Sequence, residues 1–241
     1  MHRSGATLRK SNDGTLPTLM QRARARFESF SAEKSTSSVR VPWLSEVALR
    51  ALRLEQQPFA PPKGPQSYFV DQMIDNLLGA MEESLLQSDN LIVLAGEHNS
   101  GKTCSVAQIV HGLYDQTQLF MARGSATQSA EQIVRSMLGA FRSTTPSHVD
   151  DCLEQLTNYL AEGEERASQN LLVLEDADLL DRRELQLLLN HLDHLNDSLS
   201  NSLKLLFTSA APAEQLFTGM HSDQISQGRV EEFRQPLLED N

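Results

Sequence analysis

The stretch "LIVLAGEHNSGKTCSVAQIV", residues 91–110, decides the fold of this 241-residue chain. It opens with five apolar residues, breaks at Gly96, and resumes as an amphipathic run after a Gly-Lys-Thr triplet. The apolar run predicts a buried strand, and the spacing of the later apolar residues predicts a helix. The segment from Gly96 to Thr103 fits the pattern G-x-x-x-x-G-K-[ST], which requires a strand before it and a helix after it. The sequence therefore predicts a strand, a phosphate-binding loop and a helix in succession.

Each position of this loop has a physical role. Glycines let backbone N–H groups converge on phosphate oxygens at the positive end of the following helix. The Lys102 ammonium would reach the β- and γ-phosphates, and the Thr103 hydroxyl would ligate Mg²⁺. The loop thus predicts a bound nucleoside triphosphate with Mg²⁺. The residues expected to contact the nucleotide are Gly96, Glu97, His98, Asn99, Ser100, Gly101, Lys102, Thr103 and Cys104.

A second motif supplies the carboxylates that such a site needs. In "NLLVLEDADLL", residues 170–180, four apolar residues predict a buried strand, and Glu175 and Asp176 follow at its carboxyl end. Ligands of open α/β sheets bind at that edge. One carboxylate would orient Mg²⁺ through its water shell, and the other would activate the attacking water. A solvated acidic loop is the alternative interpretation, but the phosphate loop upstream favours the site.

Short apolar strands alternate with amphipathic helices along the chain. We predict strands at 91–95, 118–122, 171–174 and 203–208, a fifth within 227–238, and helices at 101–114, 129–142, 149–161 and 182–195. Ser129 and Gln132 form a predicted capping box at the second of these helices. An earlier helix is expected to place Phe69, Met73, Leu77, Met81 and Leu85 on its apolar face. This order predicts an α/β fold in which a parallel sheet is covered on both faces.

The chain divides into a basic N-terminal arm, residues 1–57, and a predicted domain, residues 58–241. Residues 1–60 hold ten Lys and Arg against five Asp and Glu, a net charge of +5. Because the whole chain has a net charge of −11, residues 61–241 carry −16. We expect the arm to be partly disordered, with amphipathic helices around residues 19–30 and 44–52 that can dock on the body, a partner or an anionic membrane. DNA remains a candidate partner, but the acidic body does not support it.

Cysteine content and hydropathy bear on the compartment. The chain has two cysteines, too few for a disulfide framework, which fits a reducing compartment. Its apolar runs are much shorter than the roughly 20 residues needed to cross a bilayer, and its N-terminus lacks the apolar stretch of a signal peptide. We expect a cytoplasmic protein without a transmembrane segment, with attachment to the inner membrane through a partner or the basic arm as an alternative.

The two motifs resemble those of the AAA-type branch of P-loop ATPases. In that branch the second motif usually ends in Asp-Glu, whereas this chain has Glu175-Asp176. By position, Glu175 takes the metal-orienting role and Asp176 the catalytic role. Each carboxylate is displaced by one carbon, which predicts slow hydrolysis. In "LKLLFTSAAP", residues 203–212, Thr208 or Ser209 falls where the branch has a residue that contacts the γ-phosphate or the attacking water.

Other stretches resemble particular members of the branch. "QGRVEEFRQPLL", residues 227–238, resembles the last strand region of secretion-pathway and transposition-associated ATPases, where Arg229 would face phosphate or bridge subunits; a plain surface arginine is the alternative. "LEDADLL" is similar to the ATPase part of bacterial cell-division proteins that carry a peptidoglycan-binding module. The resemblance implies a P-loop NTPase three-layer sandwich with a mainly parallel sheet of about five strands. Because the chain ends at Asn241, we expect no C-terminal helical lid.

The resemblance implies an ATPase that uses ATP and Mg²⁺, with Asp176, Glu175, Lys102 and Thr208 as its catalytic residues. Such proteins act on protein or DNA partners, often as homo-oligomers, so we expect an unidentified protein partner. The alternative is a nucleotide-gated interaction module that hydrolyses little, in a cell-envelope, secretion or cell-division assembly. A small-molecule kinase is a third interpretation. ATP is preferred over GTP by resemblance, and the sequence has no Asn-Lys-x-Asp motif.

Overall fold

The computed structural model describes residues 46–51, 71–113, 117–139, 145–163, 169–199 and 203–236. Most of the expected arm, residues 1–57, and the expected start of the domain lie outside these ranges. Helix α2 (Glu46–Ala51) lies inside the second predicted amphipathic segment. Among the described helices, none combines the length and the apolar character needed to cross a membrane.

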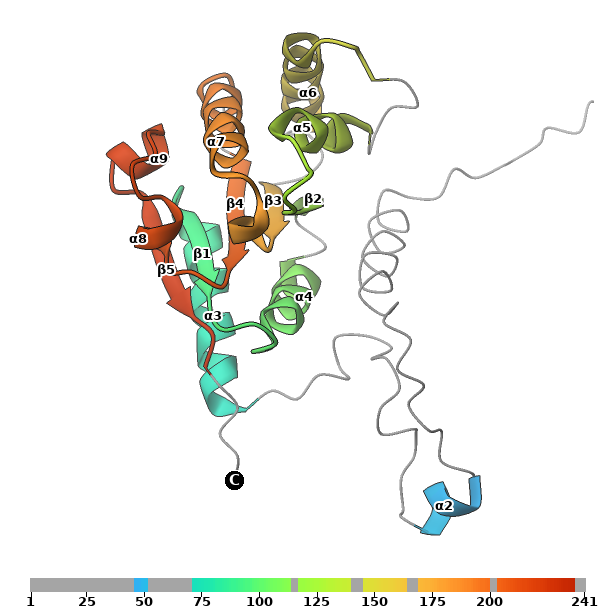
Figure 1. Ribbon diagram of the computed structural model, residues 1–241. Helices are drawn as coiled ribbons and strands as arrows, with labels where there is room; N and C mark the ends of the chain where they lie inside the picture. The colour runs from blue at the N-terminus through green and yellow to red at the C-terminus, as the bar shows by residue number, and fades with distance from the viewer. Residues whose placement is uncertain are drawn as a thin grey trace, which may run out of the picture. The chain divides into compact units, whose positions relative to one another are not determined.

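Five strands form one sheet, in the order β2-β3-β4-β1-β5, and every neighbouring pair is parallel (Figure 1). They are β1 (Leu91–Ala95), β2 (Thr117–Arg123), β3 (Gln169–Glu175), β4 (Leu203–Ser209) and β5 (Val230–Arg234). The three central strands consist mainly of buried residues, as parallel strands covered on both faces do. The predicted α/β fold with about five strands is confirmed, and the sheet is wholly parallel.

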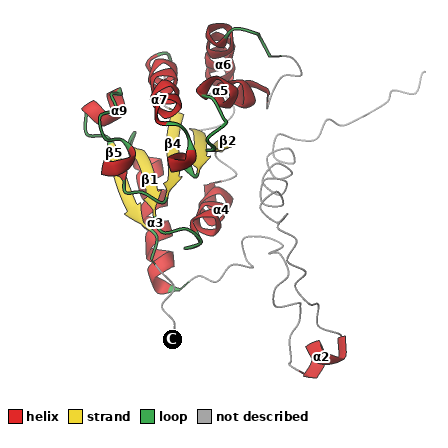
Figure 2. Ribbon diagram, in the orientation of Figure 1, coloured by secondary structure: helices red, strands yellow, loops and turns green. Residues whose placement is uncertain are grey.

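Helices cover both faces of the sheet and give three layers (Figure 2). One layer holds α3 (Gln72–Gln87) and α4 (Lys102–Leu113), and the other holds α5 (Ala130–Gly139), α6 (Val149–Gly163) and α7 (Arg182–Asp197). In β1, Leu91 and Val93 join the core under α5 to α7, whereas Ile92 and Leu94 join the core under α3 and α4. This alternation follows from the two-residue period of a strand, and it explains why β1 is apolar at every position.

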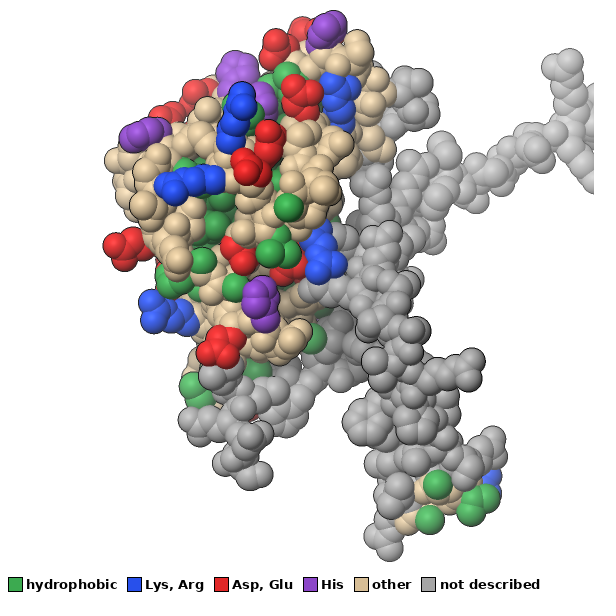
Figure 3. Space-filling model, viewed as in Figure 1, with side chains coloured by type: hydrophobic (Ala, Val, Ile, Leu, Met, Phe, Trp, Pro, Cys, Tyr) green, Lys and Arg blue, Asp and Glu red, His purple; other side chains and the backbone are tan. Residues whose placement is uncertain are grey.

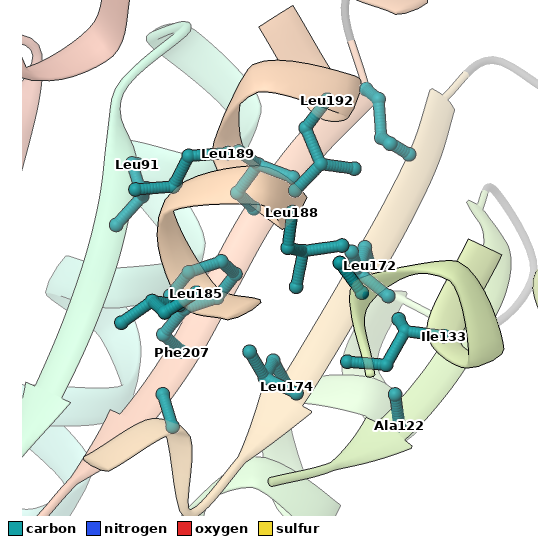
Figure 4. Close-up of a cluster of buried hydrophobic side chains, with 14 of the residues drawn as sticks. Leu91, Ala122, Ile133, Leu172, Leu174, Leu185, Leu188, Leu189, Leu192 and Phe207 are labelled. Atoms are coloured by element: carbon teal, nitrogen blue, oxygen red, sulfur yellow. The ribbon is translucent and has the colours of Figure 1, made fainter. Parts of the chain in front are cut away.

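Helix α7 is fixed over the middle of the sheet by leucines. Figure 4 shows Leu185, Leu188 and Leu192 of α7 above Leu172 of β3 and Phe207 of β4. All five side chains are at most 1% exposed. Burial of each such side chain contributes about 1.5–3 kcal/mol. Because α7 directly follows the segment that carries the acidic pair, this packing also restrains the end of β3.

The apolar face predicted for the first helix of the domain is wrong in part. Met81 and Leu85 are buried in α3, but Met73 is 64% exposed and the buried positions before Met81 are Ile74 and Leu78. A run of residues four apart advances by about 40° per step around an α-helix, so the predicted set could not stay on one face. The spacing of the observed set is closer to the helical period. Leu77 is partly buried, and Phe69 lies outside the described residues.

Local signals set several helix ends. The predicted capping box at α5 is confirmed: the Gln132 N–H donates to Ser129 Oγ at 3.2 Å, and the Ser129 N–H donates to Gln132 Oε1 at 3.0 Å. Apart from α3, which begins at Gln72 although Phe69 was predicted to belong to it, the predicted helices and strands agree with the observed ones to within about two residues wherever both ends are described. Two short helices between β4 and β5, α8 (Ala213–Leu216) and α9 (Asp223–Ser226), were not predicted. Four-residue helices are too short to show a periodic pattern.

Candidate active site

The loop from Gly96 to Thr103 carries the chain from the end of β1 into the first turn of α4. Asn99 and Gly101 have positive φ angles of 65° and 95°, a region that glycine adopts freely and asparagine tolerates. The Gly101 carbonyl accepts the N–H of Cys104 at 2.8 Å as α4 begins. The predicted strand, loop and helix are therefore confirmed, with the amino end of α4 at the loop.

The ammonium of Lys102 lies inside this loop. Lys102 is 7% exposed, and Nζ donates to the carbonyl oxygens of Gly96 at 2.7 Å and Glu97 at 2.8 Å. A buried charge must be compensated, and the loop carbonyls contribute to that compensation. An ammonium group has three protons to donate, so phosphate oxygens entering the loop can share or take over these bonds.

The other predicted nucleotide contacts vary in exposure. Glu97, His98 and Asn99 are exposed on the outer side of the loop. Ser100, Thr103 and Cys104 are half-buried, as are the two glycines. A Cβ at Gly96 would lie 2.8 Å from Gln235 Cβ and 3.0 Å from Ser100 Oγ, so the first position of the loop requires glycine for steric reasons.

The acidic pair lies at the carboxyl end of β3. Glu175 is the last residue of the strand and is completely buried. Asp176 follows in a left-handed conformation, with φ 53° and ψ 47°, which is uncommon for a residue with a side chain. Its Oδ2 accepts a hydrogen bond from Arg123 Nε at 2.9 Å, and the two side chains are 18% and 40% exposed. The two carboxylates thus have different surroundings, one inside the sheet and the other held by an arginine.

Arg123 was missed in the sequence. It ends β2, directly opposite Glu175 in the register of the sheet. The following residue, Gly124, donates its N–H to the Glu175 carbonyl at 2.7 Å, and a Cβ there would collide with the Asp176 carbonyl oxygen. A signal was present, because Arg123 directly follows a predicted strand and so falls at the same edge as the acidic pair.

The end of β4 links the two motifs. Thr208 Oγ1 accepts the Asp176 N–H at 2.9 Å, and the Ser209 carbonyl accepts the Gly96 N–H at 3.1 Å. Both residues are at most 2% exposed. β4 lies between β3 and β1, so the predicted strand between the two motif strands is in place. Asp178 adds a third link by accepting the Ala210 N–H at 3.0 Å.

Arg229 does not belong to this edge of the sheet. Its carbonyl accepts the N–H of Leu91, the first residue of β1, at 2.7 Å. Arg229 therefore precedes β5 at the amino edge, whereas the phosphate loop follows Ala95 at the carboxyl edge. The interpretation of Arg229 as a phosphate-facing residue is wrong. A residue that precedes a parallel strand lies at the amino edge of the sheet, opposite the edge that carries the phosphate loop.

A sequence model of the family described as AAA domain matches residues 84–220. The chain belongs to the AAA domain family. The predicted resemblance to AAA-type P-loop ATPases is confirmed, and the chain is a nucleotide-binding domain of that type. The likeness to secretion-pathway, transposition-associated and cell-division members stays a prediction.

Solved structures share the fold of this AAA domain. The Orc1 protein of Aeropyrum pernix, solved in complex with DNA, aligns with a TM-score of 0.52 and 17% identity over 69% of this chain. Cdc6p of Pyrobaculum aerophilum aligns with a TM-score of 0.52 and 18% identity over 73% of this chain. The chain spans 46% and 48% of those two proteins, about half of each. No curated protein sequence gives a significant match.

The residues of this AAA domain fit a magnesium nucleotide. Mg²⁺ is usually held by one or two protein oxygens together with phosphates and waters. Thr103 offers a hydroxyl at the start of α4, and Glu175 offers a carboxylate at the end of β3. Within the described residues, no group of three or more His, Cys, Asp or Glu side chains forms a separate metal site. The donor set therefore suits a metal that arrives with its phosphates.

Proposed function

We propose that this AAA domain binds Mg-ATP at the carboxyl edge of its sheet and hydrolyses it slowly, and that turnover changes its conformation on a protein or DNA partner. One observation carries the proposal: the phosphate loop, the acidic pair and Thr208 meet at the ends of β1, β3 and β4. At this point the chain leaves β1 for the distant strand β2 and later returns through β4 to β5. Such a switch point is where open α/β sheets bind ligands.

Each residue has a role in this proposal. The ammonium of Lys102 contacts the β- and γ-phosphates, and the Thr103 hydroxyl holds Mg²⁺. Bound Mg²⁺ supplies charge neutralisation on the phosphates. The carboxylate of Glu175, buried at the end of β3, orients the metal through its water shell. Asp176 accepts a proton from the attacking water, and Thr208 contacts the γ-phosphate or that water.

The ion pair of Asp176 supports slow turnover. A general base must reach the proton that it accepts, within about 2.6–3.2 Å or through one water. Oδ2 of Asp176 instead accepts a hydrogen bond from Arg123 at 2.9 Å. Asp176 is also one carbon shorter than the glutamate usual at this position of the resembling branch, and small displacements of a catalytic group slow a reaction strongly. The bond to Arg123 holds the carboxylate in one orientation, and breaking it would leave Oδ2 as well as Oδ1 able to accept the proton.

Family membership does not favour the alternative of a nucleotide-gated interaction module that hydrolyses little. Residues 58–241 are proposed as one domain and residues 1–57 as the arm. We also propose that the protein forms a homo-oligomer and is located in the cytoplasm. Figure 3 shows acidic and basic side chains interspersed over one face of the described body, without a continuous basic patch on that face. Since residues 61–241 also carry a net charge of −16, we propose that any DNA contact uses the basic residues of the arm.

The proposal is tested by titrating the full chain with ATP, ADP and GTP, with and without Mg²⁺, and by measuring phosphate release in parallel. We expect saturable, magnesium-dependent ATP binding and slow release of phosphate. Transfer of phosphate to an added small-molecule acceptor would support the kinase interpretation. Absence of both binding and turnover in a folded chain would contradict the proposed function.

A further inference from the structure

Gln235, the residue after β5, touches the phosphate loop at both of its ends. Its N–H donates to the carbonyl of Ala95, the last residue before the loop, at 2.7 Å. Its side-chain Oε1 accepts a hydrogen bond from Ser105 Oγ at 2.8 Å, and Ser105 lies in the first turn of α4, just after the loop. Gln235 is 7% exposed and Ser105 is 3% exposed, so water does not compete effectively for this bond.

The same residue also packs against the loop itself. A Cβ placed on Gly96 would lie 2.8 Å from Gln235 Cβ and 3.5 Å from the Gln235 carbonyl oxygen. A Cβ placed on Gly101 would lie 3.9 Å from Gln235 Nε2. Both glycines of the phosphate loop therefore face Gln235, and the backbone of the loop approaches it closely because these residues lack side chains.

We propose that Gln235 is a positioning residue for nucleotide binding. By bonding to both the end of β1 and the first turn of α4, it fixes the distance between the two ends of the phosphate loop and so keeps the loop in the conformation that binds phosphate. This inference rests on the proposed function and adds a residue outside both motifs. Gln235 also lies beyond residues 84–220, the part of the chain matched by the family.

The physical basis is preorganisation. A phosphate loop binds through several backbone N–H groups, which must converge before the ligand arrives, because any freedom they lose on binding reduces affinity. Gly96 is held on one side by Ser209 and on the other by Gln235, and its carbonyl in turn accepts a bond from Lys102 Nζ. A shift of Gln235 would therefore move Gly96, and with it the carbonyl that accepts a hydrogen bond from the Lys102 ammonium.

The bond to Ser105 explains why the position is polar. The Ser105 hydroxyl is buried on α4, where a donor without an acceptor is unfavourable. Gln235 supplies that acceptor and ties the helix to the end of β5. An apolar side chain of similar length would fill the same space but would leave the hydroxyl unsatisfied.

The test is a double-mutant cycle on the full chain with Gln235→Met, Ser105→Ala and the two combined, measured as the dissociation constants of ATP and ADP well below the unfolding midpoint. We expect each single substitution to weaken both nucleotides about fivefold to tenfold. The double variant is expected to bind nucleotide no more weakly than the single variant with the lower affinity. Both substitutions remove the same hydrogen bond, so their effects should not add. ADP is expected to follow ATP because the loop amides contact the β-phosphate that both nucleotides share.

Gln224→Met is the matched control. Gln224 is also buried, at 4% exposure, but lies in α9, and its carbonyl accepts the N–H of Arg229 at the amino edge of the sheet. It should leave nucleotide affinity unchanged. If Gln235→Met fails to fold, Ser105→Ala tests the same bond from the helix.

The outcomes separate the two proposals. A wild-type chain that binds no nucleotide overturns the proposed function and this inference with it. A wild-type chain that binds ATP while Gln235→Met and Ser105→Ala bind equally well overturns this inference alone. A lower unfolding midpoint with unchanged dissociation constants also overturns it, because a purely structural role predicts that result.

Discussion

The phosphate loop and the acidic edge differ in how far apart their parts lie in the sequence. The loop is formed by consecutive residues, and most of its contacts join residues a few positions apart. The acidic edge is assembled from three strands: Asp176 contacts Arg123, 53 residues away, and Thr208, 32 residues away. Nucleotide binding is therefore encoded largely locally, whereas hydrolysis depends on how β2, β3 and β4 pack. Changes at the acidic edge should alter turnover before they alter binding.

The largest effect should come from the loop. Lys102→Ala removes a buried ammonium from the phosphate site and should weaken ATP binding by about 100-fold or more, as loss of one partner of a buried charge pair does. The measurement is a nucleotide titration. Lys204→Ala is the matched control, because Lys204 is also largely buried but binds Ser88 and Asp89 instead. An equal loss in both variants would show that the loop lysine has no special role.

Gly124 tests the packing of the acidic edge. Gly124→Ala places a Cβ against the Asp176 carbonyl and should lower the free energy of unfolding by about 1–3 kcal/mol, the usual effect of overpacking. Gly79→Ala, on an exposed face of α3 with nothing within 4 Å, should instead raise it by about 0.5–1 kcal/mol. Chemical denaturation measures both. A Gly124→Ala variant as stable as the wild type would mean that β2 and the end of β3 do not approach closely.

Glu175 should control the metal rather than the phosphates. Glu175→Gln removes the negative charge at the end of β3 and should weaken the Mg²⁺ dependence of ATP binding by about tenfold, the size usual for a group that orients metal-bound water. Affinity for ATP in the presence of a chelator should change little. Asp178→Asn, a nearby acidic residue that bonds to Ala210, serves as the control. An unaltered magnesium dependence would remove Glu175 from the metal site.

The smallest effect should come from Arg123. Arg123→Gln frees Asp176 from an ion pair between partly exposed groups, which is worth at most about 1 kcal/mol. Phosphate release should therefore rise by about two- to fivefold, with ATP affinity unchanged. Arg183→Gln, at an exposed position near the start of α7, should leave turnover as it is. Slower release in Arg123→Gln would show instead that Arg123 assists the reaction.

The same contrast explains what the sequence could predict. The loop, β1 and the start of α4 follow from one contiguous pattern, and the strand of the acidic pair follows from its apolar run. The contacts of Arg123 and Gln235 depend on which strands are neighbours, and strand order is not visible in local periodicity. Arg229 lies at the amino edge for a different reason: it directly precedes β5, and residues that precede parallel strands lie at that edge whatever the strand order. Met73 was misplaced because a four-residue spacing was taken for a helical face.

The most direct test of the account compares ATP binding and phosphate release in the wild type and Asp176→Asn. If Asp176 is the general base at a site whose binding is built elsewhere, the variant should release phosphate at least about 100-fold more slowly. It should bind Mg-ATP as tightly as the wild type, because the loop is unchanged. Equal turnover in the two proteins, or parallel loss of binding and turnover in a folded variant, would contradict the separation of binding from hydrolysis.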